Sequence, residues 1–395
     1  MKELRVIGLM FFALLLVACS SDGESPEQMQ PVINIYVYSP DQPVVTRGDI
    51  GNVDPIKNDL NESLITSLQI WVFEHGTGNL VSYYKPETVR NLNDNKGVTY
   101  QLAVSEAFSK ADPKPYVDVY VVANVVANVE ANVEEDNYGI TLGESTTRTY
   151  LEEEAKIGTS YFGLEPLIDK VPAKGLPMSG VLRDVAVTGM APVFNISSVK
   201  LTRAVSKLRF IFSKDNIETT VAIKSINLGA DLNSENQETS VSQIPTEEYL
   251  FLKADQSLYH IGNTYEDGGK ALLSSSLVDI NKNDDPIKYA YQPGQNAQDY
   301  ENLIATGVSE NKLSEVGPFY LRESDKQLSG VITYQIGDAA EKKAVFKMKD
   351  PGDFSRNHTW IVYAYYGEEG MQVVTAYIQD WEELYVKSPH NLYNW

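Results

Sequence analysis

The chain has 395 residues, 43% of them hydrophobic, which is enough apolar material for about two or three globular domains. Lys and Arg number 33 against 54 Asp and Glu, and the net charge of −21 would repel a phosphate backbone, so we expect no nucleic acid partner. The single Cys excludes an intrachain disulfide. The four His residues lie far apart in the sequence, so the usual zinc and imidazole-base patterns are missing.

The N-terminus has the pattern of a lipoprotein signal peptide. A short basic region precedes residues 6–18, an apolar run too short to span a bilayer, which takes about 20 residues. The run ends in Leu-Val-Ala before Cys19 and a polar stretch, which resembles a bacterial lipobox. We expect residues 1–18 to be removed and Cys19 to be diacylated, and Ser20 favours the outer membrane by resemblance to sorted lipoproteins. The alternative is that Cys19 is an ordinary buried thiol.

Residues 28–60 resemble a leader more than a domain. They contain one apolar run, Val32 to Tyr38, flanked by prolines, and a single strand cannot bury itself. Arg47 follows in an Arg-Gly-Asp sequence, within a stretch poor in regular structure where proteolysis is favoured. Three interpretations stay open: an exposed Arg without a role, an integrin-like motif, and a trypsin-like processing site between Arg47 and Gly48.

Cleavage after Arg47 would have a structural consequence. It would release the lipid together with the strand at residues 32–38. If that strand is paired in a sandwich, its loss opens an apolar groove with two unpaired sheet edges, which is unstable until another strand fills it.

Beyond residue 64 the apolar residues alternate with a period of two, which is typical of strands buried on one face. Turn-forming residues between two such runs predict a hairpin at residues 68–84. The same alternation predicts further strands at residues 117–122, 343–349, 360–366 and 371–381.

Helical periodicity is limited. We expect one or two helical turns at residues 105–110, and a capping box at Thr149 to Glu152 precedes a short run to Ile157. Short strands and few helices therefore favour an all-β chain of antiparallel Greek-key β-sandwiches with short helical crossovers.

Sequence motifs for catalysis are not found. Nucleophile elbows, P-loops, dinucleotide-binding glycines and paired His residues are all missing. The acidic segments 231–238 and 281–285 lack the Gly and the twelfth-position Glu of a calcium loop, so we expect solvated turns. We predict that the protein is not an enzyme, with no catalytic residue, no metal and no cofactor.

Several segments along the chain resemble the fimbrillins, the subunits of type V pili. Besides the lipobox at Cys19 and the downstream Arg47, the matching pieces are Val119 to Asn124, Leu176 to Gly180, Leu201 to Leu208, Phe319 to Ser324, Arg356 to His358 and Val373 to Trp381. The resemblance implies two transthyretin-like β-sandwiches. It also implies export as a lipoprotein, cleavage after an Arg by a trypsin-like protease of gingipain type, and polymerisation by strand exchange.

With this resemblance the chain divides into four parts. Residues 1–18 are the signal peptide and 19–47 a propeptide with the leader strand. Residues 48–195 form the N-terminal β-sandwich, and 196–395 form the C-terminal one with a possible donor tail at 383–395.

The donor tail has a strand-like pattern. Leu384 and Val386 fall on one face and Leu392 is in phase with them, whereas Pro389 requires a bend or an edge. The tail is therefore either donated to a neighbouring subunit or is a final edge strand of its own domain.

The predicted function is a structural subunit of a cell-surface fimbria, assembled by protease-triggered strand exchange and serving adhesion. Its partners would be other pilin subunits, an Arg-specific trypsin-like protease, outer-membrane lipid before cleavage, and a host or bacterial surface receptor. The alternatives are a tip adhesin, a lipid-retained anchor subunit, or a surface glycan-binding lipoprotein. The last would use aromatic platforms at Tyr363, Tyr365, Tyr366 and Tyr377, although such faces are more often core.

Overall fold

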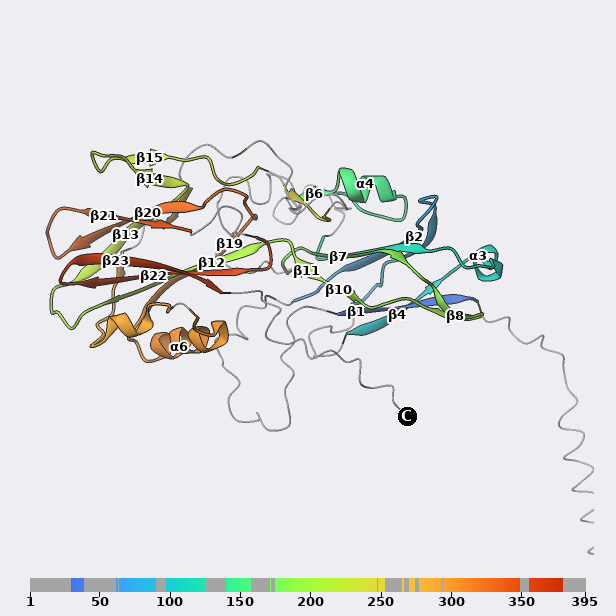
Figure 1. Ribbon diagram of the computed structural model, residues 1–395, viewed down its shortest axis with the longest axis horizontal. Helices are drawn as coiled ribbons and strands as arrows, with labels where there is room; N and C mark the ends of the chain where they lie inside the picture. Colours follow the sequence, from blue (N-terminus) through green and yellow to red (C-terminus); the bar gives the residue numbers. More distant parts are fainter. Residues whose placement is uncertain are drawn as a thin grey trace, which may run out of the picture.

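The computed structural model describes residues 30–38, 62, 64–89, 97–125, 140–157, 171, 175–246, 248–252, 265, 270–273, 277–292, 294–348 and 355–378. The strands form two groups that follow each other along one long axis (Figure 1). We call them the N-terminal half and the C-terminal half. Among the described helices, none has the length and the apolar character needed to cross a membrane.

The first sheet of the N-terminal half contains the leader strand, and we call it the leader sheet. Its strand order is β10-β1-β9-β8, with β4 on the other edge of β1. Strand β1 (Val32–Tyr38) runs antiparallel to β4 and parallel to both β9 and β10. The other strands are β4 (Val98–Ala103), β8 (Thr188–Met190), β9 (Val193–Asn195) and β10 (Val199–Lys200).

The second sheet of this half, which we call the back sheet, is antiparallel with the order β11-β7-β5-β2-β3. Its strands are β2 (Leu68–Glu74), β3 (Leu80–Tyr84), β5 (Val117–Ala123), β7 (Met178–Val185) and β11 (Thr202–Arg203). The inner faces of both sheets contribute to one apolar core, so the half is a β-sandwich. The core includes Ile33 and Ile35 of β1, Ile70 of β2 and Val121 of β5.

The back sheet is also covered on its outer face. There α4 (Arg148–Glu153) lies over β2 and β5, and Trp71 and Tyr120 pack in a second apolar cluster with Leu151 of this helix. The short helix α3 (Glu106–Lys110) leads from β4 to β5, and Ser105 caps its N-terminus by accepting a hydrogen bond from the Phe108 amide at 3.1 Å.

The C-terminal half is built from two more sheets that share an apolar core. One has the order β19-β12-β22-β23 and the other β17-β13-β20-β21, with β18 also paired to β13. The strands are β12 (Ser206–Lys214), β13 (Val221–Leu228), β17 (Lys270–Leu273), β18 (Val278–Asp279), β19 (Ser314–Leu321), β20 (Ser329–Ile336), β21 (Lys342–Lys347), β22 (Thr359–Gly367) and β23 (Gly370–Ile378).

Two small sheets and two helices complete the fold. Strands β14 (Ala230–Leu232) and β15 (Glu238–Ser240) form a hairpin, and β6 (Lys156–Ile157) pairs with β16 (Glu248–Tyr249). The 13-residue α6 (Ala297–Ser309) and the 3-10 helix η2 (Pro286–Tyr289) cover the outer face of β12 and β22.

The prediction of a mostly β chain built as two sandwiches is confirmed. The parallel pairs β1–β9, β1–β10 and β12–β22 were not expected, because alternation does not reveal the direction of a neighbouring strand. Helix α4 begins after Thr147, two residues before the predicted cap at Thr149. The sheets of the N-terminal half continue to Arg203 in β11, beyond the residue 195/196 boundary that the sequence suggested.

Candidate functional site

The candidate site is the position that β1 occupies in the leader sheet (Figure 1). One edge of β1 pairs with β4 from Val32↔Ala103 to Val37↔Val98. The other edge pairs first with β9, at Val32↔Val193 to Asn34↔Asn195, and then with β10. The predicted leader strand is therefore an interior strand with neighbours on both sides.

The inward face of β1 is apolar. Ile33, Ile35 and Val37 alternate along the strand, and each is 0% exposed in the sandwich core. Burying such a side chain contributes about 1.5–3 kcal/mol, so the three together contribute roughly 5–9 kcal/mol as an upper estimate. The slot that holds β1 thus has three aliphatic positions at a spacing of two residues.

The outward face of β1 is polar and aromatic. Asn34 donates a hydrogen bond from its amide to Asn195 Oδ1 at 3.0 Å, and Tyr36 lies 5.9 Å from Tyr38 between ring centroids. Tyr36 stays 37% exposed. A Cβ at Gly97 would lie 2.5 Å from the Tyr36 ring and 2.6 Å from the Val37 carbonyl oxygen, so the chain before β4 needs glycine there. This face is held less tightly than the inward one.

Backbone hydrogen bonds extend beyond the strand pairs. The Val32 amide donates to the Pro192 carbonyl at 2.8 Å, and the Val104 amide donates to Pro31 at 2.9 Å. At the other end, the Leu201 amide donates to the Tyr38 carbonyl at 3.0 Å. The leader strand is thus fastened at both ends by main-chain groups, which any other sequence in an extended conformation could also supply.

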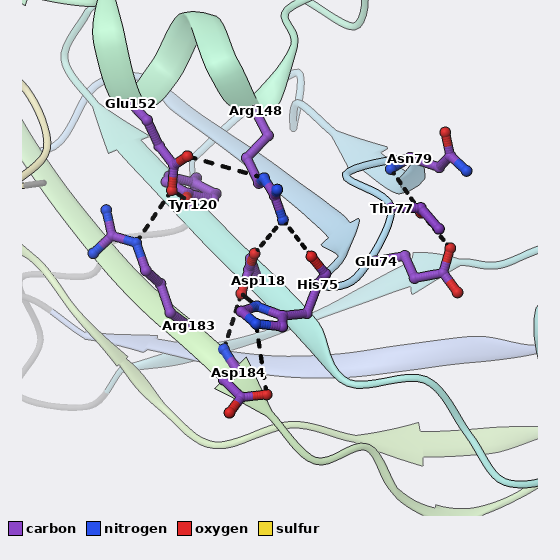
Figure 2. Close-up of polar contacts among 10 residues, drawn as sticks. All are labelled: Glu74, His75, Thr77, Asn79, Asp118, Tyr120, Arg148, Glu152, Arg183 and Asp184. Atoms are coloured by element: carbon purple, nitrogen blue, oxygen red, sulfur yellow. Dashed lines mark hydrogen bonds and ion pairs between the residues drawn. The ribbon is translucent and has the colours of Figure 1, made fainter. Parts of the chain in front are cut away.

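A polar cluster lies where β2 ends and β5 begins (Figure 2). Asp118, which is 2% exposed, accepts a hydrogen bond from the Arg148 guanidinium at 2.8 Å and one from the Asp184 amide at 2.9 Å. The His75 ring nitrogen Nδ1 lies 2.7 Å from Asp118 Oδ1. Its other nitrogen, Nε2, lies 3.9 Å from a carboxylate oxygen of Asp184. The buried carboxylate is therefore surrounded by donors from three elements.

The same cluster continues along α4. Glu152 accepts hydrogen bonds from the Tyr120 hydroxyl and from Arg183 Nε, the latter at 3.3 Å (Figure 2). Burial, followed by the hydrogen bond to Glu152, raises the pKa of Tyr120. Since Arg148 and Glu152 belong to the helix and their partners to the back sheet, the cluster fastens α4 to the sheet.

The described residues hold no group of three or more His, Cys, Asp or Glu side chains placed to bind a metal ion.

A buried ion pair connects the two halves. Lys207 Nζ at the start of β12 donates to both carboxylate oxygens of Glu62, at 3.0 and 2.9 Å, and the Tyr320 hydroxyl donates to the same carboxylate at 2.6 Å. Burial lowers the pKa of Lys207 despite the carboxylate beside it. The Glu62 carbonyl also accepts a hydrogen bond from Arg203 at 3.0 Å. Glu62 therefore fixes the chain that follows the predicted cleavage site to the junction of the halves.

A second charged cluster lies beside this junction. Glu248 is 0% exposed in β16, with Oε1 3.6 Å from Arg356, and Oε2 accepts a hydrogen bond from the Glu323 amide at 3.1 Å. Burial, and secondarily the nearby Glu323, raises the pKa of Glu248 to about 7. Within the described residues Oε1 makes no hydrogen bond.

Only some of the predicted site residues lie within the described part of the chain. Cys19, Arg47, Gly48, Leu384, Val386 and Leu392 all lie outside the described residues. Of the predicted aromatic platform, Tyr363 is 0% exposed, and its hydroxyl donates to the Pro286 carbonyl at 2.7 Å. Tyr365 and Tyr366 are partly buried, and the Tyr377 side chain lies outside the described part. Tyr363 is therefore a core residue beneath η2.

Glu62, Asp118 and Glu248 were not among the residues predicted from the sequence. Their partners are far away in the chain, at a separation of 145 residues for Glu62 and Lys207. Acidic residues are abundant in this chain, so composition could not mark these three. The one local signal was the apolar run after Asp118, which makes a carboxylate at the start of a buried strand unusual.

Residues 52–242 match the family model described as "Major fimbrial subunit protein (FimA)". The chain is also similar in structure to the tip fimbrial protein Mfa3 from Porphyromonas gingivalis, with 11% identity, a TM-score of 0.44, and coverage of 89% of this chain and 100% of that one. A fimbrial assembly protein from Parabacteroides distasonis has 13% identity, a TM-score of 0.40, and coverage of 89% and 96%.

A third similar structure, provisionally described as a cell adhesion protein from Parabacteroides distasonis, has 13% identity, a TM-score of 0.46, and coverage of 88% and 97%. The comparison with curated protein sequences found no match.

Proposed function

Because the chain belongs, through residues 52–242, to the family of major fimbrial subunit proteins (FimA), we propose that it is a polymerising subunit of a cell-surface fimbria. In this proposal a trypsin-like protease cuts between Arg47 and Gly48, β1 leaves the leader sheet, and the tail of a neighbouring copy fills the slot. The filament then serves cell adhesion. The family itself is one of structural proteins and is not known for enzymes.

The observation that carries the proposal is the position of β1. It is an interior strand of the leader sheet, it precedes Arg47 in the chain, and its inward face is Ile33, Ile35 and Val37. Removing an interior strand exposes two sheet edges and an apolar groove at once, and an extended peptide can satisfy both. In this proposal β1 fills the slot until it is cut off, so a neighbouring subunit can bind there only after cleavage.

The donor would be residues 383–395. Leu384 and Val386 are spaced by two residues, which matches two of the three aliphatic positions of the slot, and Leu392 is in phase with them. Each buried aliphatic side chain contributes about 1.5–3 kcal/mol, and main-chain pairing with β4, β9 and β10 would add to this before the ordering cost of the tail is subtracted. If the tail instead stays in its own domain, the chain accepts a strand but does not donate one.

Export and anchoring complete the proposal. Cys19 would carry the acyl chains that hold the precursor at the outer membrane, and cleavage at Arg47 would free the subunit from them. A lipid-retained anchor subunit would keep Cys19 and leave Arg47 uncut, whereas a tip adhesin would be cut and would not donate its tail. A glycan-binding lipoprotein is less well supported, because Tyr363 is buried.

N-terminal sequencing and intact mass of the protein from sheared filaments test the proposal. We expect a chain that begins at Gly48, with no lipid. A lipidated start at Cys19 on every copy in the filaments would contradict cleavage-dependent assembly and would favour the anchor. Sequencing the cell-bound fraction in parallel controls for incomplete processing.

A further inference from the structure

Large apolar side chains gather on the exposed surface at the end of the N-terminal half that is far from the C-terminal half. They are Tyr116, Met190 and Val193, with exposed fractions of 54%, 84% and 41%. We call this surface the N-terminal pole. Figure 1 shows β1, β8 and α3 reaching the same end of the molecule. Exposed apolar groups that gather in one place mark interaction sites more often than scattered ones do.

The strand register shows how these residues come together. Met190 is paired with Val193 across the β8–β9 hairpin, and Val193 is paired with Val32 at the start of β1. The ammonium group of Lys114 lies 5.2 Å from the ring centroid of Phe194, and Tyr116 follows two residues later. The N-terminal pole therefore surrounds the end of the slot at which β1 begins.

The direction of a replacement strand decides which end of the slot it enters. A strand that runs as β1 does keeps the antiparallel pairing with β4, which is continuous from Val32 to Val37. A reversed strand would be parallel to β4 and antiparallel only to β9 and β10, which β1 meets in two short pieces. Antiparallel pairing is slightly more stable per residue, so the direction of β1 is favoured and the donor enters at the N-terminal pole.

The length of the donor chain then limits the distance between the two subunits. Strand β23 ends at Ile378, which is paired with Thr359 at the start of β22. Six residue steps separate Ile378 from Leu384, the first proposed slot residue, and they span at most about 20 Å. The N-terminal pole of the acceptor must therefore lie close to the end of β23 of the donor.

Residues 379–383, which we call the connection, link β23 of the donor to its donor strand, and their side chains suit a contact with the N-terminal pole. Residues 379–383 read Gln-Asp-Trp-Glu-Glu, so they combine one large aromatic side chain, Trp381, with three carboxylates. The N-terminal pole offers Met190 and Val193 as an apolar surface and the Lys114 ammonium group, which donates to the Ser109 carbonyl oxygen, as a nearby cation. Trp is enriched among the residues that carry most of the binding energy of protein interfaces.

Resting on the strand exchange proposed above, we infer that the N-terminal pole is a docking surface for a second copy of this chain. Trp381 of the donor seats on Met190 and Val193 of the acceptor before the donor strand enters the slot. The joint between subunits thus has two parts, the slot and the pole. The pole recognises the connection rather than the strand.

Two peptides separate these parts. Residues 379–395 contain the connection and the strand, and residues 384–395 contain the strand alone. Their binding is measured by fluorescence anisotropy on the processed full chain, as wild type, as Met190→Ser, and as the control Leu277→Ser. Leu277 is 60% exposed in the C-terminal half, so the control removes an exposed apolar side chain away from the pole without changing the charge.

We expect the longer peptide to bind about tenfold more tightly than the shorter one on the wild type and on Leu277→Ser, because one well-packed aromatic contact is worth that factor. On Met190→Ser the advantage should disappear while the shorter peptide binds as before. Equal binding of both peptides to the wild type would overturn the inference and leave the slot intact. An advantage that survives both Met190→Ser and Tyr116→Ser would also overturn it. If neither peptide binds, strand exchange itself fails.

Discussion

Strands β1 and β12 open the two halves of the molecule and occupy comparable positions. Each lies between an antiparallel neighbour, β4 or β19, and a parallel one, β9 with β10 or β22. The parallel pairing of β12 with β22 is continuous from Lys207 to Lys214, whereas that of β1 is divided between two short strands. The two halves thus place their first strand in the same way and hold it unequally.

The faces of the two strands differ even more. Helix α6 and η2 cover the second face of β12, so Ile211 is 0% exposed there. The second face of β1 carries Tyr36, which is 37% exposed. A strand buried on one face can leave without uncovering a second layer, and a strand buried on both cannot. The comparison explains how one half could exchange its first strand while the other serves as a fixed body.

The largest effect concerns the release of β1. Replacing Arg47 with Ala removes the cation that a trypsin-like protease recognises, so we expect the uncut, folded precursor and no filaments, as judged by electron microscopy and intact mass. Asp49→Ala is the matched control, because it breaks the Arg-Gly-Asp sequence and keeps the cleavage site. Filament formation by Arg47→Ala at the wild-type level would contradict the cleavage model.

Ile35→Ala and Ile211→Ala compare the two strands directly. Both side chains are 0% exposed, so each change should lower the free energy of unfolding of the precursor by about 2–5 kcal/mol. In processed filaments the Ile211 defect should persist, whereas the Ile35 defect should vanish with the leader. Chemical denaturation of both forms measures this. An Ile35→Ala defect that persists in filaments would mean that β1 is retained.

Glu248→Gln tests the connection between the halves, since β16 pairs with β6. The raised pKa, about 7, means that the folded protein holds a proton that the unfolded chain releases above about pH 4.5. The stabilising contribution is therefore present below pH 4.5 and is lost as pH rises through 7. Relative to wild type, the variant should gain up to about 3 kcal/mol between pH 5 and pH 8. A constant difference across that range would contradict the raised pKa.

The smallest expected effect is on the open face of β1. Tyr36→Ser removes a half-exposed ring and should change precursor stability by less than about 1 kcal/mol. Tyr363→Phe, on the covered face of the C-terminal half, loses the hydroxyl that bridges Ser213 and the Pro286 carbonyl and should cost about 1–2 kcal/mol. A larger loss of thermal stability for Tyr36→Ser than for Tyr363→Phe would show that the outer face of β1 is more tightly packed than its exposure indicates.

Local patterns predicted much of the fold. The apolar run at residues 32–38 correctly located β1, and alternation correctly located the β2–β3 hairpin, β5 and β22. The helical turns expected at residues 105–110 correspond to α3. Helix α6 was missed although Tyr300, Ile304 and Val308 have helical spacing, because Gly307 and the β-branched residues weaken its intrinsic propensity. Local signals thus located strands buried on both faces, such as β5, and failed for α6, which buries only one face.

Less of the candidate site could be predicted from the sequence. The apolar run at residues 32–38 and the Arg after it were visible, and so was the possibility that the strand is paired. Its actual neighbours were not, because Val193 and Val199 lie more than 150 residues later and parallel pairing has no local signature. The Asp118 and Glu248 clusters were hidden for the same reason, since each combines side chains from distant strands and helices.

The hydrogen bonds along both edges of β1 also determine how the slot responds to force. The strand in the slot lies between β4 on one side and β9 and β10 on the other. Tension along its axis therefore loads the hydrogen bonds of both edges at the same time, in shear. Peeling from one end would break them one at a time. Rupture under load is governed by the rate of crossing the unfolding barrier, so a joint loaded in shear survives far longer than its equilibrium affinity suggests. Such a slot suits a filament that is stretched.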